Sequence, residues 1–149
     1  MKNELNMKKL YEEKLGDKIG EYKFPPPSYM LMHTEITEYD KENMVLETKM
    51  PVKEIFLNAF GTMQGGLIVA AMDNAIGALG MLIAPLNVTR NIESKLIKAI
   101  SMETEVIYTT AKLMEYKKRR LTFDVEVKDK NGTVYAKATI INWILEENK

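Results

Sequence analysis

The fold is decided by residues 62–84, which read TMQGGLIVAAMDNAIGALGMLIA and form the longest apolar run of the chain. About 20 apolar residues suffice to cross a membrane, but this run has a charged residue, Asp73, at its middle. A charge at that depth disfavours insertion by about 2.5–3.5 kcal/mol. A helix that is apolar on all sides is better explained as the buried helix of a globular fold, so we expect a central helix and no membrane span.

The segments around this helix have the patterns of strands. Two strand candidates precede it, residues 31–39 and 43–50, and four follow it, residues 88–98, 105–115, 121–127 and 133–145. The dipeptide Asn131-Gly132 predicts a type I′ turn between the last two. This order predicts an α+β fold in which an antiparallel β-sheet wraps around one long central α-helix. Small helix residues would let the sheet approach closely: Ala70, Ala71, Ala75, Gly77, Ala78 and Gly80.

Residues 1–30 are predicted to be a helical extension of one domain that spans residues 1–149. Residues 3–16 have the amphipathic pattern of a short helix. Three prolines at positions 25–27 stop that helix and impose an extended turn. The segment that follows, PSYMLM, is compatible with one more short helix.

The composition excludes several classes of function. The chain has 21 basic and 21 acidic residues, and this balance argues against a broad basic surface for nucleic acid. It has no cysteine and one histidine, His33, which rules out thiolate chemistry and a multi-histidine metal site. The N-terminus lacks the apolar segment of a secretory signal. We expect a cytoplasmic protein that binds no metal, nucleic acid or membrane.

Glycines cluster where the loop becomes the helix, at Gly61, Gly65 and Gly66. Glycine lets the backbone come close to a ligand, and the first N–H groups of a helix lack partners inside it. Those donors and the helix dipole suit a carbonyl oxygen that gains negative charge. A plain helix start with a tight packing turn explains the same residues equally well.

Asp73 favours the functional explanation, because burying an unpaired carboxylate is strongly unfavourable. Its carboxylate could form an ion pair with a basic residue such as Arg90, or it could face a subunit interface. It could instead act as a general base on water or as a nucleophile, and we favour this role. Asn74 beside it is equally ambiguous.

Other polar residues have both a structural and a functional explanation. Asn58 could be a turn residue, and Gln64 could be a surface amide or a hydrogen-bond donor into the site. The basic run from Lys117 to Arg120 is either a solvated hairpin tip or a docking place for the phosphates of coenzyme A.

The spacing of Asn58, Gly61, Gln64-Gly65-Gly66 and Asp73-Asn74 resembles the signature of the hotdog-fold acyl-CoA thioesterases of the phenylacetate-degradation type. Residues 88–100 resemble that family's next strand, and the likeness extends over about residues 30–146. The resemblance implies a hotdog fold and hydrolysis of acyl-CoA thioesters to a free acid and coenzyme A. It implies no cofactor beyond the coenzyme A of the substrate. It also implies a homodimer or homotetramer with the active site at the subunit interface.

The resemblance also implies roles for single residues. Gly65 would polarise the thioester carbonyl through its N–H, and Asp73 would be the base or nucleophile. Asn58 would place the water or the thioester, and Thr89 would supply a helper hydroxyl. The expected substrate contacts are Gly66, Asn74, Arg90, Lys118 and Arg119.

Gln64 departs from the family pattern, since histidine usually stands at its position. An amide cannot carry a proton between groups near neutral pH. The alternative is therefore a non-catalytic protein of the same fold that binds acyl-CoA or an acyl chain. A dehydratase on this fold is disfavoured, because His33 is the only histidine and lies far from the motif.

Overall fold

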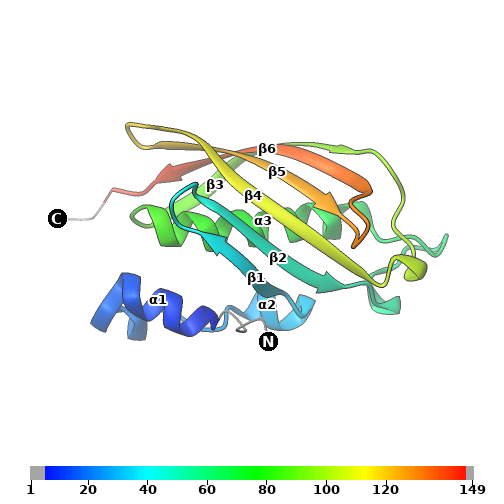
Figure 1. The fold of residues 1–149 in the computed structure, drawn as a ribbon, viewed down its shortest axis with the longest axis horizontal. Helices are drawn as coiled ribbons and strands as arrows, with labels where there is room; N and C mark the ends of the chain where they lie inside the picture. The colour runs from blue at the N-terminus through cyan, green and yellow to red at the C-terminus, as the bar shows by residue number, and fades with distance from the viewer. Residues whose placement is uncertain (1–5, 147–149) are drawn as a thin grey trace.

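A computed structural model describes residues 6–146 and shows an antiparallel sheet of six strands curved around one long helix (Figure 1). The helix is α3 (Gly65–Ile83). The order across the sheet is β1-β2-β4-β5-β6-β3, which makes β1 and β3 the edges. The strands are β1 (Glu35–Asp40), β2 (Val45–Pro51), β3 (Asn87–Leu96), β4 (Val106–Lys117), β5 (Arg120–Lys128) and β6 (Val134–Ile144). The predicted α+β architecture is confirmed.

The core lies between the inner face of the sheet and α3. β5 alternates as its sequence predicts, and it buries Leu121, Phe123, Val125 and Val127. The face of α3 that packs against the sheet contributes fully buried side chains, among them Met72, Ile76 and Leu79. Burial of each large apolar side chain stabilises the fold by about 1.5–3 kcal/mol. α3 is also long and apolar enough to cross a membrane, and half of its most apolar window is buried inside the protein.

The N-terminal extension packs on α3 (Figure 1). It consists of α1 (Met7–Leu15), the 3-10 segment η1 (Gly16–Glu21) and α2 (Pro27–Met32). The Tyr11 hydroxyl donates to the carbonyl oxygen of Ala78 at 3.1 Å, and the Tyr29 hydroxyl donates to that of Asn74 at 2.6 Å. These acceptors are one helical turn apart, so both tyrosines bind the same side of α3. The predicted N-terminal helix is confirmed over residues 7–15; its first residues lie outside the described range.

Two local predictions are wrong. The first strand begins at Glu35 and not at residue 31, because residues 27–32 form the helix α2. This helix buries Tyr29 and Met32. The turn at 129–132 is not type I′, because Gly132 has a positive φ (84°) and Asn131 does not. The Asp129 side chain instead accepts hydrogen bonds from the N–H groups of Asn131 and Thr133 and holds a longer turn.

Two further 3-10 segments are η2 (Glu54–Phe56) and η3 (Met102–Thr104).

The small residues of α3 are divided between its faces. Ala71, Ala75, Ala78 and Gly80 are buried, as expected for a helix that a sheet approaches closely. Gly77 is exposed, so the prediction that it serves this approach is wrong. Its position on the helix directs it away from the sheet.

Candidate active site

The turn before α3 is organised by the side chain of Asn58. Its Oδ1 accepts from the N–H groups of Phe60 (2.9 Å) and Thr62 (3.1 Å), while its Nδ2 donates to Thr62 Oγ1 at 2.9 Å. Gly61 has a φ of 79°, which glycine adopts without strain. Asn58 thus has a clear structural role, and its contact with water or substrate stays a prediction.

Gln64 is the N-cap of α3. Its Oε1 accepts from the N–H of Leu67 at 2.9 Å, so the amide satisfies one of the orphan donors at the helix start. Its Nε2 has no partner within residues 6–146 and is able to donate to a ligand. The side chain is exposed.

The N–H groups of Gly65 and Gly66 point out of the helix start and donate to no acceptor among residues 6–146. An added Cβ would lie 2.9 Å from Leu96 Cδ1 at Gly65 and 2.9 Å from Gln64 Oε1 at Gly66. Each of these atoms is the end of a flexible side chain, so a small shift would admit a Cβ and packing alone does not require glycine. Open donors at a helix N-terminus also suit an oxygen that carries negative charge.

Asp73 is half-buried on α3 and accepts a hydrogen bond at Oδ1 from the hydroxyl of Thr89. The distance of 2.6 Å is that of a short O–H···O hydrogen bond. The other oxygen, Oδ2, has no donor in the described part of the chain. The structure thus brings together two residues predicted for the site. The alternative of an Asp73–Arg90 pair is not realised, since the exposed Arg90 makes no ion pair in this range.

Gly65 and Asp73 of one chain lie too far apart to contact the same carbonyl group. Gly65 and Asp73 are eight residues apart on one helix, which separates them by about 12 Å along its axis. A carbonyl group must lie about 3 Å from both the oxyanion donor and the attacking group. The Gly65 donor and the Asp73 carboxylate of the same chain therefore cannot act on one thioester.

Asn74 is tied to the N-terminal extension. Its Nδ2 lies 3.4 Å from both Met32 Sδ and Thr34 Oγ1, and its carbonyl oxygen accepts from the Tyr29 hydroxyl. Burial, with smaller contributions from the charges of Tyr11 and Asp73, raises the pKa of Tyr29 well above its usual value. These contacts next to Asp73 were missed from the sequence, because no pattern links residues so far apart. A substrate contact by Asn74 stays a prediction.

The basic run forms the turn between β4 and β5. The Arg119 side chain already has partners within the chain. Its guanidinium donates to the carbonyl oxygen of Ile144 at 3.0 and 2.8 Å and forms an ion pair with Glu146 at 2.9 Å. Lys118 adopts a positive φ (57°) and is exposed. Phosphate binding by this turn stays a prediction, and Arg119 would have to release these partners to take part in it.

A buried amide pair near the site was also missed. Asn142 is 2% exposed, and its Nδ2 donates to Asn87 Oδ1 at 2.8 Å. Asn87 Nδ2 in turn donates to the carbonyl oxygens of Gly80 (3.1 Å) and Pro85 (2.8 Å). Since Asn142 is also the sheet partner of Thr89, this pair connects the end of α3 with the strand that holds Asp73. The sequence did contain one sign of this pair, because Asn142 stands inside the apolar run IINWIL, where a polar side chain needs a buried partner.

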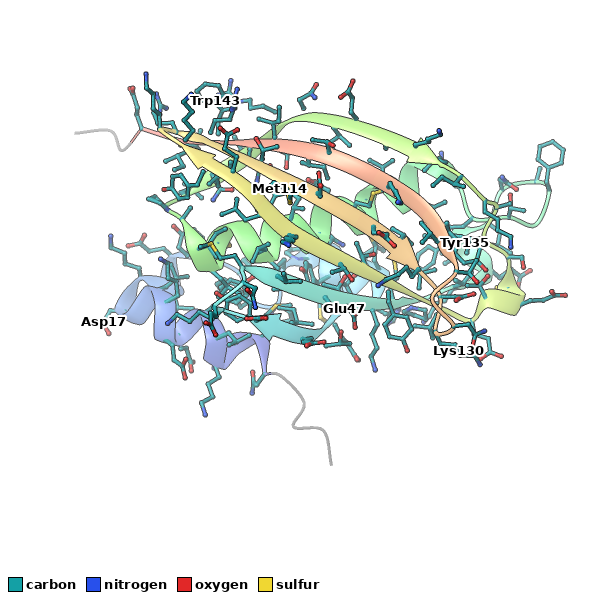
Figure 2. The ribbon with its side chains drawn as sticks, turned by 45° about the horizontal axis from the view of Figure 1, so that its top comes forward. Asp17, Glu47, Met114, Lys130, Tyr135 and Trp143 are labelled. Carbon is teal, nitrogen blue, oxygen red and sulfur yellow. The ribbon has the colours of Figure 1, made fainter. Side chains whose placement is uncertain are left out.

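The outer face of the sheet carries a separate depression of about 790 Å³. Charged residues of β3, β4, β5 and β6 line it together with Met114, which Figure 2 labels. Asp73 and Gly65 do not line it. No group of three potential metal ligands occurs among residues 6–146.

Comparisons with known proteins show the family and the fold. The model of the thioesterase superfamily matches residues 60–136. The PaaI protein of the E. coli phenylacetic acid degradation operon has a TM-score of 0.76 at 12% identity, over 96% of this chain and 99% of its own. A phenylacetic acid degradation-related protein of Ralstonia eutropha reaches 0.76 at 20% identity, over 85% and 97%. No curated protein sequence matches.

A third solved structure is a hypothetical thioesterase protein from Streptococcus pneumoniae with coenzyme A. It has a TM-score of 0.70 at 18% identity, over 78% of this chain and 88% of its own. At these identities the likeness concerns the fold, and it confirms the predicted hotdog arrangement of sheet and helix.

Proposed function

Since the chain belongs to the thioesterase superfamily, we propose that it hydrolyses acyl-CoA thioesters to a free acid and coenzyme A. The observation that carries the proposal is the 2.6 Å hydrogen bond from Thr89 to Asp73, which is the one ionisable residue of α3. This bond orients the carboxylate and leaves Oδ2 open for chemistry. The neighbour from Streptococcus pneumoniae with coenzyme A supports this class of substrate.

In the proposed reaction, Asp73 Oδ2 takes a proton from water while the water oxygen attacks the thioester carbonyl carbon. The Gly65 N–H donates to the carbonyl oxygen as it becomes negative. The C–S bond then breaks, and the coenzyme A sulfur leaves with the electron pair and takes up the proton. Direct attack by the carboxylate would give an anhydride that water opens, with the same products.

Gln64 is compatible with this scheme. A thiol has a pKa of about 8.5, so its thiolate leaves without a strong general acid. The reaction therefore does not require the proton transfer that an amide cannot perform. Gln64 would act as the cap that sets the direction of the Gly65 N–H and, through its open Nε2, as a second donor to the thioester.

The site requires a second copy of the chain. A two-fold axis near residue 69 would place two antiparallel α3 helices so that Gly65 of one chain lies beside Asp73 of the other. β3 is an edge strand and is available to pair with its own copy. Large apolar side chains near Gly65 are exposed in one chain, with Phe60 91% and Ile55 81% exposed. We propose a homodimer, alone or paired into a tetramer, that acts in the cytoplasm.

Coenzyme A is anionic, and two groups of the predicted set are open to receive it. Arg90 is the extra residue of a bulge in β3, beside Thr89, and is exposed. Lys118 is exposed in the β4–β5 turn, at the end of the sheet where β3 begins. We propose that these cations bind the phosphates, while Gly66 and Asn58 line the approach to the carbonyl.

Release of free thiol from a panel of acyl-CoA esters tests the function. Wild type should release thiol from at least one ester, and Asp73→Ala should lose this turnover. Turnover that is unchanged in Asp73→Ala would refute the catalytic role. Binding of acyl-CoA without any turnover by the wild type would instead establish the non-catalytic acyl-CoA binding protein.

A further inference from the structure

Asn142 is a polar residue on the inner face of β6, where its neighbours are apolar. It is 2% exposed, and its ladder partner on β5, Leu121, is fully buried. Its Nδ2 donates to Asn87 Oδ1 at 2.8 Å, while its Oδ1 accepts from no group within residues 6–146. A buried amide is disfavoured unless it is hydrogen-bonded. The bond to Asn87 is therefore the contact that an amide at this position serves.

Asn87 is the first residue of β3 and joins this strand to the last turns of α3. Its Nδ2 donates to the carbonyl oxygens of Gly80 and Pro85 at 3.1 and 2.8 Å. A Cβ at Gly80 would lie 2.6 Å from Asn87 Oδ1, so the absent side chain of Gly80 leaves the room that this amide occupies. Together, Asn87 and Asn142 connect α3, the start of β3 and β6.

Thr89 lies next to these two amides. Asn87 and Thr89 are two residues apart on β3, so their side chains point to the same face of the sheet. Thr89 is also the ladder partner of Asn142, and directly opposite residues have Cβ atoms about 4.5–5.5 Å apart. The hydroxyl that donates to Asp73 is therefore flanked by both amides.

The sheet ladder alone holds this part of β3 weakly. The bulge at Arg90 interrupts the pairing of β3 with β6 directly after Thr89, so the strand has three paired residues, 87–89, before the bulge. A bulge bends its strand and changes the direction of nearby side chains. β3 is also an edge strand, with no second neighbour in the sheet of residues 6–146. A further contact at the start of the strand is therefore needed to keep Thr89 at 2.6 Å from Asp73.

We propose that Asn142 is a positioning residue: with Asn87 it fixes the start of β3, so that the Thr89 hydroxyl reaches Asp73. This inference rests on the proposed function. Asn142 makes no hydrogen bond to Asp73 and acts on the reaction through Thr89.

A double-mutant cycle with Thr89 tests the inference. Asn142→Leu removes the amide and keeps the approximate size of the side chain. We expect kcat for an acyl-CoA ester to fall at least about fivefold while KM stays within about twofold, because orientation and not substrate binding is lost. Since Asn142 acts through Thr89, the double variant Thr89→Val/Asn142→Leu should be at most about twofold slower than Thr89→Val. A further loss of about fivefold or more in the double variant, or a wild-type kcat in Asn142→Leu, would overturn the inference.

Val127→Ala is the control for a general loss of stability. Val127 is fully buried on β5, six residues and about 20 Å along the strand from Leu121. Its truncation should lower the urea midpoint and leave kcat as in wild type. If Asn142→Leu does not fold, Gly80→Ala takes its place, because its Cβ would displace the Asn87 amide from the helix side. The same loss of kcat is expected there, and a wild-type kcat would contradict the positioning role.

Nuclear magnetic resonance separates this inference from the proposed function. The carboxyl carbon signal of Asp73, assigned with Asp73→Asn, reports the hydrogen bond from Thr89 without any turnover. If wild type hydrolyses no ester but Asn142→Leu moves this signal to its position in Thr89→Val, the function fails and the effect of Asn142 on Thr89 stands. If the signal in Asn142→Leu equals that of wild type, the positioning role is overturned.

Discussion

At the scale of single residues, the proposed chemistry divides between a carboxylate and a backbone N–H. Asp73 is oriented by one hydroxyl, and Gly65 offers an N–H donor that no group within residues 6–146 accepts. Each of these features can be removed without changing the fold around it. Two substitutions therefore test them separately.

Gly65→Pro deletes the proposed oxyanion donor. Gly65 is the first residue of α3, where proline is tolerated, and Gln64 before it is already extended (φ −59°, ψ 128°). We expect kcat for an acyl-CoA ester to fall by about 100-fold or more. Gly65→Ala is the matched control, because it adds the same Cβ near Leu96 but keeps the N–H. Equal losses in both variants would show that the N–H is not used.

Thr89→Val removes the bond to Asp73 while keeping the shape of the side chain. A hydrogen bond to a charged group contributes about 1.5–3 kcal/mol, so we expect kcat to fall by about tenfold or more. Thr89→Ser keeps the hydroxyl and should stay within a few-fold of wild type. A Thr89→Val enzyme as fast as wild type would mean that Asp73 needs no orientation.

The sequence singled out Asp73 and Thr89 but not the bond between them. The resemblance to a family implied a helper hydroxyl at Thr89, while residues 16 apart give no local signal that the two side chains meet. The alternative partner, Arg90, is the next residue of the same strand, but it is the extra residue of a bulge and is exposed. The contacts from Tyr29 and Thr34 to Asn74 depend on how the N-terminal extension returns to α3, and no short-range pattern encodes that return.

At the scale of elements, the N-terminal extension is held on α3 by two buried hydroxyls. Tyr11 and Tyr29 are 2% and 5% exposed, and each donates to a helix carbonyl oxygen. Burial raises the pKa of both tyrosines above the usual value of about 10. The ionised form is therefore disfavoured in the folded state.

This shift predicts instability at high pH. A raised tyrosine pKa contributes stability in full below about pH 10, the unfolded value, and loses it as the pH rises further. We expect the urea midpoint to fall steeply above this pH in wild type and less steeply in Tyr11→Phe/Tyr29→Phe. Tyr116→Phe, at an exposed tyrosine of β4, is the control and should follow wild type. The same slope in all three proteins would contradict the account.

The sequence predicted most elements, including the short helix in PSYMLM that the structure shows as α2, but it placed the start of the first strand inside that helix. The long helix and the alternating strand β5 have strong patterns, and the structure confirms both. Residues 27–32 were joined in part to the first strand, because a run of apolar residues this short fits a helix or a strand equally well. Burial of Tyr29 and Met32 against the rest of the protein decides for the helix.

At the scale of the whole molecule, the sequence predicted an antiparallel sheet but not its order. β3 follows α3 in the chain yet lies beside β6 at the edge. This placement brings Thr89 to Asp73 and leaves β3 open to another copy. If Gly65 and Asp73 act on one thioester as proposed, the separation of about 12 Å between them, from about 1.5 Å per residue, means that two chains share the site.

Mixed chains test this sharing. Asp73→Ala and Gly65→Pro are each expected to be inactive alone. When the two are unfolded and refolded together, half of the dimers combine one chain of each kind and regain one intact site. About a quarter of wild-type activity should return. Mixtures that stay inactive while forming dimers would show that the two residues act within one chain or not at all.

The central claim is that Asp73 performs the chemistry, and Asp73→Asn tests it most directly. Asparagine keeps the size of the side chain and an oxygen that accepts from Thr89, but it cannot take a proton or attack the carbonyl. The measurement is kcat for thiol release from an acyl-CoA ester, with the Kd of the same ester determined alongside. The account predicts that kcat falls by about 100-fold or more while Kd stays within a few-fold of wild type. A kcat equal to that of wild type would contradict it.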